Sequence, residues 1–170
     1  MKEFPTRKHP RLKGYDYSQN GACFITFCVK DKHEMLGQIV VGRGILDAPF
    51  VKLSEYGNAL AGAIEFMNNN NHEIGIVKYV IMPNHVHMIV VVDNLSNGAS
   101  GMPRPTNALI PKLISSIKRF VNRQAGFNLW QRSFHDHIIR SDDDYIRILQ
   151  YIEDNPARWR EDVYYVPHLA

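Results

Sequence analysis

The sequence has little of what membrane proteins and secreted proteins require. No uninterrupted apolar stretch approaches the ~20 residues that a membrane-spanning helix needs. The charged residues at positions 1–8 are not followed by an apolar run, so they do not resemble a secretory signal. We therefore expect a cytoplasmic protein without a membrane partner.

Cysteine is also scarce, since Cys23 and Cys28 are the only two in the chain. Both fall in a run that is typical of one β-strand, at an odd spacing that places their side chains on opposite faces and roughly 17 Å apart along the strand. A disulfide needs Cα atoms within about 7 Å, which excludes this pairing. Two cysteines alone also make a poor zinc site.

Charge of one sign is not in large excess, because the net charge is only +3 among 170 residues, of which 45% are hydrophobic and 22% charged. These values exclude an intrinsically disordered chain and fit one globular domain over residues 1–170. The basic residues are nevertheless clustered in segments 1–13 and 107–132: Lys2, Arg7, Lys8, Arg11, Lys13, Lys112, Lys118, Arg119, Arg123 and Arg132. The clusters indicate an anion-binding face, for which nucleic acid is the usual ligand, or a solvated basic surface.

Hydrophobic periodicity predicts an α+β fold without internal repeats. Segments 24–29, 74–82, 85–92 and 134–139 are typical of strands, and Pro83-Asn84 is typical of a hairpin turn between two of them. Residues 59–67, 109–121 and 141–155 have helical spacing, with Ser141 as the N-cap of the last helix. We expect one mainly antiparallel sheet with helices packed on it, and residues 93–105 as a loop within the domain.

Apolar stripes predict which helix faces are buried. In the last helix the stripe contains Tyr145, Ile148, Leu149 and Ile152. In the basic helix it contains Leu109, Ile110, Leu113, Ile114, Ile117, Phe120 and Val121.

The pair His85 and His87 is the first candidate for chemistry. Residues i and i+2 of a strand point to the same face, so both imidazoles project together, while Val86, Met88, Val90 and Val92 fill the opposite face. Imidazole is the commonest side-chain ligand of catalytic metals. The alternative is two surface histidines on an exposed sheet face.

Tyr151 and Asn155 are the second candidates. Tyr151 lies off the apolar stripe of the last helix, and Asn155 follows one turn later on the same face. A phenol, with an ordinary pKa of about 10, is a nucleophile only when its phenolate is stabilised or its proton is removed. With two imidazoles, the Asn155 amide oxygen could complete a site for Mg²⁺ or Mn²⁺. The alternatives are a solvent-facing tyrosine and an Asn-Pro pair that ends the helix.

A second histidine pair, His135 and His137, offers a rival site. Together with His85 and His87 it could form a four-histidine zinc centre of a hydrolase. The alternative is that His137 is a satisfied structural histidine.

Taken together, these motifs resemble a known family. The stretch Val80-Ile81-Met82-Pro83-Asn84-His85-Val86-His87 resembles the metal motif of the HUH endonuclease superfamily. Residues 130–140 and the tail Tyr151-Ile152-Glu153-Asp154-Asn155-Pro156 resemble insertion-sequence-200-like single-tyrosine transposases, and most of all the branch associated with repetitive extragenic palindromes. The resemblance covers about residues 11–160 and includes the opening at residues 11–24.

The resemblance implies a ferredoxin-like sheet and a metal-dependent reaction on single-stranded or hairpin DNA. By it, His85, His87 and Asn155 would hold Mg²⁺ or Mn²⁺, and Tyr151 would attack the scissile phosphate to give a 5′-phosphotyrosine link and a free 3′-OH, which reversal would rejoin. Family members are often homodimers, which leaves open whether Tyr151 acts in its own subunit.

The chain departs from the family pattern at Gly21-Ala22-Cys23-Phe24, where related members often have Gly-Thr-Trp-Phe. A non-catalytic nucleic-acid-binding module with the same fold is an alternative to the enzyme. For DNA contacts we predict Lys118, Arg119 and Arg123 on the basic helix and Arg11 and Lys13 near the N-terminus. Base stacking is predicted for Tyr15, Tyr17 or Trp130.

Overall fold

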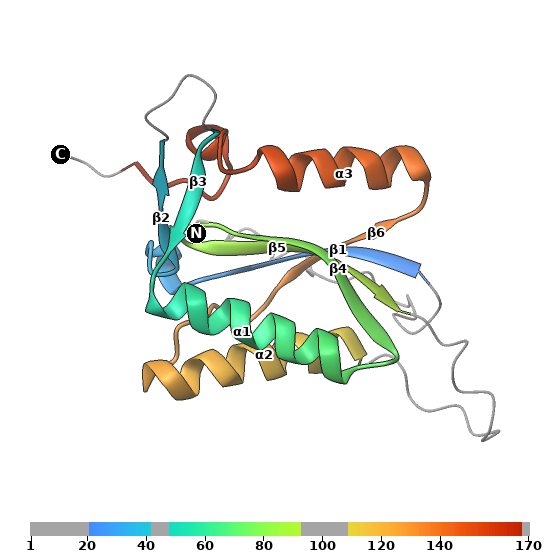
Figure 1. Ribbon diagram of the computed structural model, residues 1–170, viewed down its shortest axis with the longest axis horizontal. Helices are drawn as coiled ribbons and strands as arrows, with labels where there is room; N and C mark the ends of the chain where they lie inside the picture. The colour runs from blue at the N-terminus through green and yellow to red at the C-terminus, as the bar shows by residue number, and fades with distance from the viewer. Residues whose placement is uncertain (1–20, 42–47, 93–108, 168–170) are drawn as a thin grey trace, which may run out of the picture.

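The computed structural model describes residues 21–41, 48–92 and 109–167 (Figure 1). The predicted DNA contacts at Arg11 and Lys13, the stacking residues Tyr15 and Tyr17, and the predicted loop at 93–105 lie outside these ranges. Within them the prediction of an α+β fold is confirmed.

A four-stranded antiparallel sheet forms the centre of the molecule, with strand order β4-β5-β1-β6. Among the elements of this sheet and the two helices packed on it, α1 comes between β1 and β4 in the chain, and α2 comes between β5 and β6. The order is therefore strand, helix, strand, strand, helix, strand, as in a ferredoxin-like fold. The elements are β1 (Gly21–Cys28), α1 (Glu55–Asn70), β4 (Ile74–Ile81), β5 (His85–Val92), α2 (Leu109–Ala125) and β6 (His135–Ile139).

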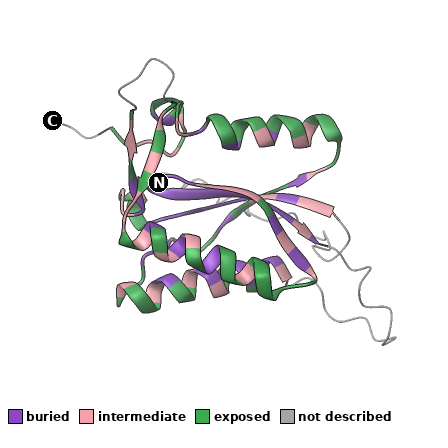
Figure 2. Ribbon diagram, viewed as in Figure 1, coloured by how far each residue is buried: buried purple, intermediate pink, exposed green. Residues whose placement is uncertain are grey.

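Helices α1 and α2 lie side by side on one face of the sheet and enclose the main core (Figure 1). The predicted alternation of β5 is confirmed, because Val86, Met88, Val90 and Val92 all belong to this core. The predicted α2 stripe is also confirmed, except that Phe120 remains 36% exposed. The two innermost strands, β1 and β5, are buried along most of their length (Figure 2).

Helix α3 (Asp142–Asp154) covers the opposite face of the sheet (Figure 1). It begins as predicted, because the Ser141 hydroxyl accepts a hydrogen bond from the Asp144 N–H at 3.2 Å. Its apolar stripe packs Ile148 and Ile152 against Ile89 of β5 in a second, smaller cluster. Strand β5 therefore lies between two layers of helices.

The sequence does not predict the short strands β2 (Gly37–Val40) and β3 (Phe50–Leu53), which pair with each other as a separate two-stranded sheet. Each strand has only four residues, too few for alternation to stand out from chance. After α3 the chain forms a 3-10 turn, η3 (Trp159–Glu161), and then runs back toward the start of β5. This return is not predicted either.

Cys23 and Cys28 are buried and form no disulfide, in agreement with the exclusion of their pairing from the sequence. Burial, and for Cys23 the nearby Asp136 carboxylate, raises the pKa of each thiol to about 11. In the part of the chain that the structure describes, no helix combines the length and the apolar character needed to cross a bilayer.

Gly57 allows α1 to approach the segment that precedes β2, and this contact gives a stability prediction. A Cβ at position 57 would lie 2.0 Å from the Leu36 carbonyl oxygen, so Gly57→Ala forces the backbone apart. We expect Gly57→Ala to lower the free energy of unfolding by about 1–3 kcal/mol in urea denaturation, although alanine is the better helix former.

Gly62, in the same helix, is the matched control. It is exposed, and a Cβ there would meet no atom within 4 Å. Gly62→Ala should therefore be neutral or stabilise the protein by up to about 1 kcal/mol. Equal effects of the two substitutions would contradict the proposed steric role of Gly57.

Candidate active site and metal centre

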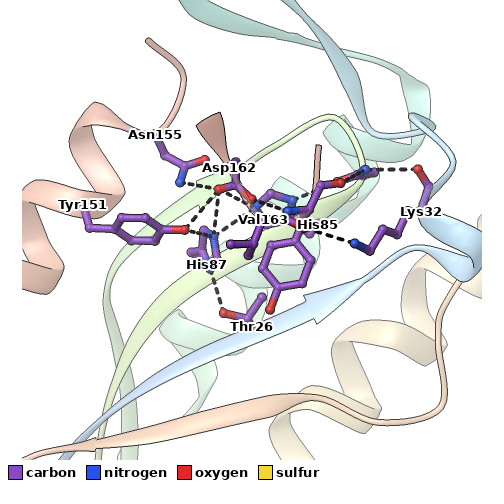
Figure 3. A network of polar contacts seen from close by, with 10 residues as sticks. Thr26, Lys32, His85, His87, Tyr151, Asn155, Asp162 and Val163 are labelled. Carbon is purple, nitrogen blue, oxygen red and sulfur yellow. Dashed lines mark hydrogen bonds and ion pairs between the residues drawn. The ribbon is translucent and has the colours of Figure 1, made fainter. Parts of the chain in front are cut away.

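His85 and His87 lie at the beginning of β5 and are completely buried, at 0% and 1% exposure. Their Nε2 atoms are 2.9 Å apart, so both imidazoles point toward one place (Figure 3). The prediction that they share a face is confirmed. The alternative of two exposed histidines is wrong, because α3 and the segment after η3 cover this end of the strand.

Tyr151 reaches the histidines from α3. Its phenol oxygen lies 3.2 Å from His87 Nε2, and its ring contacts the rings of Phe24 and His87 at centroid distances of 6.0 and 5.1 Å. The contact is made within one chain, so the tyrosine needs no second subunit to approach the pair. Tyr151 is 39% exposed, which leaves one side of the phenol open to solvent.

Asp162 is the site residue that the sequence analysis missed. Its Oδ2 accepts hydrogen bonds from the Tyr151 hydroxyl at 3.1 Å and from Asn155 Nδ2 at 2.9 Å, and it lies 3.9 Å from both histidine Nε2 atoms. Oδ1 accepts from the Tyr164 N–H at 2.7 Å. An isolated Asp after a helix carries no spacing signal, and only the turn at η3 brings it to the histidines.

The buried carboxylate is the one formal negative charge among these groups. Burial alone would raise the pKa of Asp162, but the nearby His87 imidazole and hydrogen bonds from the Tyr164 N–H and Asn155 outweigh burial and lower the pKa below its ordinary value. Burial lowers the pKa of both His85 and His87, so they are neutral at pH 7. Burial and the Asp162 charge raise the pKa of Tyr151, which disfavours the phenolate.

Asn155 lies at the end of α3, one turn beyond Tyr151, and is 3% exposed. Its Nδ2 is bonded to Asp162, whereas its Oδ1 is buried and has no hydrogen-bond partner. An unsatisfied buried oxygen costs roughly 1–3 kcal/mol, so a missing partner is expected there.

The donor set fits a divalent cation. His85, His87 and Asp162 each offer a ligand atom, and these atoms lie within 4.8 Å of one another. Two neutral nitrogens, one carboxylate and the free Asn155 oxygen suit a hard or borderline cation such as Mg²⁺ or Mn²⁺. The role predicted for Asn155 as a ligand stays a prediction, and Asp162 joins it as a candidate.

The second histidine pair is not brought to this site. Both side chains are exposed on the edge strand β6, and His137 Nε2 is bonded to Asp144 at 2.7 Å. Among the residues described, the group able to hold a metal contains neither His135 nor His137. The contact with Asp144 matches the alternative reading of His137 as a satisfied structural histidine.

The predicted DNA contacts on α2 lie on the other side of the sheet from Tyr151 (Figure 1). Arg119 and Arg123 are exposed, but the Lys118 ammonium donates hydrogen bonds to the carbonyls of Gln131 and Ser133 at 2.8 and 3.1 Å. The prediction that Trp130 stacks on a base is wrong, because Trp130 is only 2% exposed and packs against Phe27 in the core.

An open cavity of about 270 Å³ lies beside the phenol of Tyr151. It shares Arg158 and Glu161 with a larger groove of about 610 Å³ that runs between the segment after α3 and the β2 strand. Trp159 and Tyr165 contribute to the wall of that groove. The two hollows therefore adjoin at Arg158 and Glu161.

Comparisons with known proteins support the resemblance. No family model matches the chain. An uncharacterized protein of Haemophilus influenzae is 30% identical over 175 residues, covering 94% of this chain and 93% of that protein. A second protein of the same organism, described as a "Putative REP-associated tyrosine transposase", is 22% identical and covers 84% of this chain and 74% of its own length.

Among solved structures, a REP-associated tyrosine transposase bound to a REP hairpin superposes with a TM-score of 0.61 and 21% identity, covering 88% of this chain and 73% of that one. This likeness confirms the predicted HUH-type, ferredoxin-like fold. The chain belongs to the same family as the uncharacterized Haemophilus influenzae protein and has the fold of a REP-associated tyrosine transposase.

Proposed function

We propose that this protein is a cytoplasmic, metal-dependent DNA strand transferase in which Tyr151 cleaves and rejoins single-stranded or hairpin DNA. The observation that carries the proposal is the 3.2 Å approach of the Tyr151 phenol to His87, beside the buried His85 and Asp162. No packing requirement explains two imidazoles, a carboxylate and a half-exposed phenol gathered at one end of a strand.

The electrostatics of the site support dependence on a cation. The Tyr151 phenolate would form next to the Asp162 carboxylate, and two neighbouring negative charges in a buried site are unfavourable. A divalent cation held by His85, His87 and Asp162, with Asn155 as a further ligand, would compensate this charge and polarise the phosphate as a Lewis acid.

The reaction follows from the placement of the phenol. Tyr151 Oη forms a bond to the phosphorus of the scissile phosphate, the bond from phosphorus to the 3′ oxygen breaks, and that oxygen takes a proton to become a free 3′-OH. The phenolic proton passes to solvent at the exposed side of Tyr151, and the 3′ oxygen takes its proton from solvent. Attack of a 3′-OH on the resulting 5′-phosphotyrosine reverses these steps and joins strands.

The substrate proposed is hairpin DNA, since the solved structural neighbour is bound to a REP hairpin. The cavity beside Tyr151 and the groove that continues from it would accept an unpaired strand next to the scissile phosphate. Arg119 and Arg123 are proposed to contact the DNA backbone from α2, which requires the DNA to extend around the edge of the sheet.

A covalent adduct tests the nucleophile. Incubated with labelled hairpin DNA and Mn²⁺, the wild-type protein should form a DNA adduct that survives a denaturing gel, and Tyr151→Phe should form none, since it lacks the attacking oxygen. Tyr145→Phe, in the apolar stripe of the same helix, is the matched control and should retain the adduct.

An adduct that persists in Tyr151→Phe would rule out this nucleophile. Absence of any adduct in the wild-type protein, together with salt-dependent DNA binding that ignores chelators, would favour the non-catalytic binding module.

Metal binding tests the ligand set. Asp162→Asn keeps the shape of the side chain but removes its charge, so Mn²⁺ affinity measured by calorimetry should fall at least about 10-fold. His137→Ala should leave the affinity unchanged, because His137 contacts Asp144 and not the cluster. Loss of metal from His137→Ala, with zinc co-purifying, would instead support the four-histidine centre.

DNA binding tests the basic helix. Arg119→Ala should weaken binding of hairpin DNA uniformly across sequences and reduce the slope of log K against log salt by roughly 0.7–0.9, without changing the melting temperature. Lys118→Ala is the contrasting variant, because its ammonium holds the chain at Gln131 and Ser133, and it should lower the melting temperature. Unchanged DNA binding in Arg119→Ala would remove α2 from the proposed interface.

A further inference from the structure

The Nδ1 atoms of His85 and His87, on the side of each ring away from the cluster, have different hydrogen-bond partners. His85 Nδ1 is bonded to Asn84 Oδ1 at 2.8 Å. His87 Nδ1 is bonded to Thr26 Oγ1 at 2.7 Å (Figure 3). Asn84 is 0% exposed and Thr26 is 4% exposed, so water does not replace either partner. The chemistry of these two partners determines which nitrogen of each ring carries a proton.

Asn84 allows only one arrangement. Its Nδ2 donates to the carbonyl oxygens of Lys32 and Tyr164 at 3.0 and 2.9 Å, and carbonyls only accept. Asn84 Oδ1 must therefore face His85, which fixes the proton of His85 on Nδ1. The lone pair of His85 Nε2 always points into the cluster, as a metal ligand requires.

His87 cannot be arranged in the same way before a cation binds. His87 Nε2 lies 2.9 Å from His85 Nε2. Because His85 Nε2 carries no proton and can only accept a hydrogen bond, the proton shared by the two nitrogens must belong to His87 Nε2. The Tyr151 oxygen, 3.2 Å from the same nitrogen, can also accept this proton, since its own hydrogen points to Asp162. In the metal-free protein His87 is therefore protonated at Nε2, and its Nδ1 accepts from the Thr26 hydroxyl.

Thr26 can reverse this bond. A hydroxyl is both donor and acceptor, and the Thr26 side chain also interacts with the phenol of Tyr164. If Thr26 turns its hydrogen toward Tyr164, its oxygen can accept a proton from His87 Nδ1. An amide that is fixed like Asn84 could not do this.

We propose that Thr26 is a positioning residue that lets His87 exchange a proton on Nε2 for one on Nδ1 when a divalent cation binds, while Asn84 keeps His85 permanently in the metal-binding form. The inference rests on the metal site of the proposed function. The ring loses one proton to solvent at Nε2 and gains one from solvent at Nδ1, so its charge does not change.

Nuclear magnetic resonance of ¹⁵N-histidine-labelled protein tests the exchange directly. In the metal-free protein the long-range ¹⁵N–¹H pattern should place the proton on Nδ1 of His85 and on Nε2 of His87. Addition of Zn²⁺, used as a diamagnetic probe, should move the His87 proton to Nδ1 and leave the His85 proton in place. His85 is thus an internal control in the same spectrum.

Thr26→Val supplies the second measurement, because it replaces the hydroxyl with a methyl group and keeps the β-branched shape in β1. We expect it to fold, to lose 10–100-fold in Zn²⁺ and Mn²⁺ affinity, and to leave His87 on the Nε2 form. Thr26→Ser, which restores the hydroxyl, should recover the affinity of the wild type. Failure of serine to rescue a folded valine variant would assign Thr26 to packing and overturn the proposal.

The outcomes separate this inference from the proposed function. If the wild type binds Zn²⁺ at these histidines but His87 keeps one tautomer, or Thr26→Val binds as tightly as the wild type, the role of Thr26 is wrong and the metal site stands. If the wild-type histidine signals do not respond to Zn²⁺ or Mn²⁺, the metal site itself is wrong and this inference fails with it.

Discussion

The pairing of β5 with β1 is the contact on which the other features of this protein depend. It is antiparallel over the full length of both strands, and the register places Thr26 opposite His87 and Cys28 opposite His85. Because β5 is covered on both faces, its apolar residues stabilise the core under α1 and α2 while its histidines are enclosed on the other side. A shift of one residue would exchange the two sets of side chains between the faces.

Burial of the Asp162 charge explains why the end of α3 and the segment after η3 meet at this strand. A carboxylate with 1% side-chain exposure needs hydrogen-bond donors, and it finds them on Tyr151, Asn155 and the Tyr164 backbone. The same contacts orient the phenol and leave the Asn155 oxygen without a partner. A network with one formal negative charge, neutral imidazoles and a free oxygen provides the ligand atoms of a candidate cation site.

The two proposed interactions with DNA occupy different layers of the molecule. The phosphate chemistry is placed beside α3, whereas the exposed arginines of α2 lie beyond the sheet (Figure 1). The groove beside β2, which is lined by Trp159 and Tyr165, shares Arg158 and Glu161 with the cavity at Tyr151. Strand β2, absent from the sequence prediction, thus lines the groove next to the cavity of the proposed reaction.

The sequence by itself determined the long elements, the order of the ferredoxin-like fold and the shared face of His85 and His87, because each depends on local periodicity over many residues. It also singled out Tyr151 and Asn155, which are one helical turn apart. Only the tertiary structure decided that Asp162 joins them, that Trp130 is buried, and that His137 contacts Asp144. These outcomes depend on contacts between segments distant in the sequence, and a pattern confined to one segment carries no information about its partner.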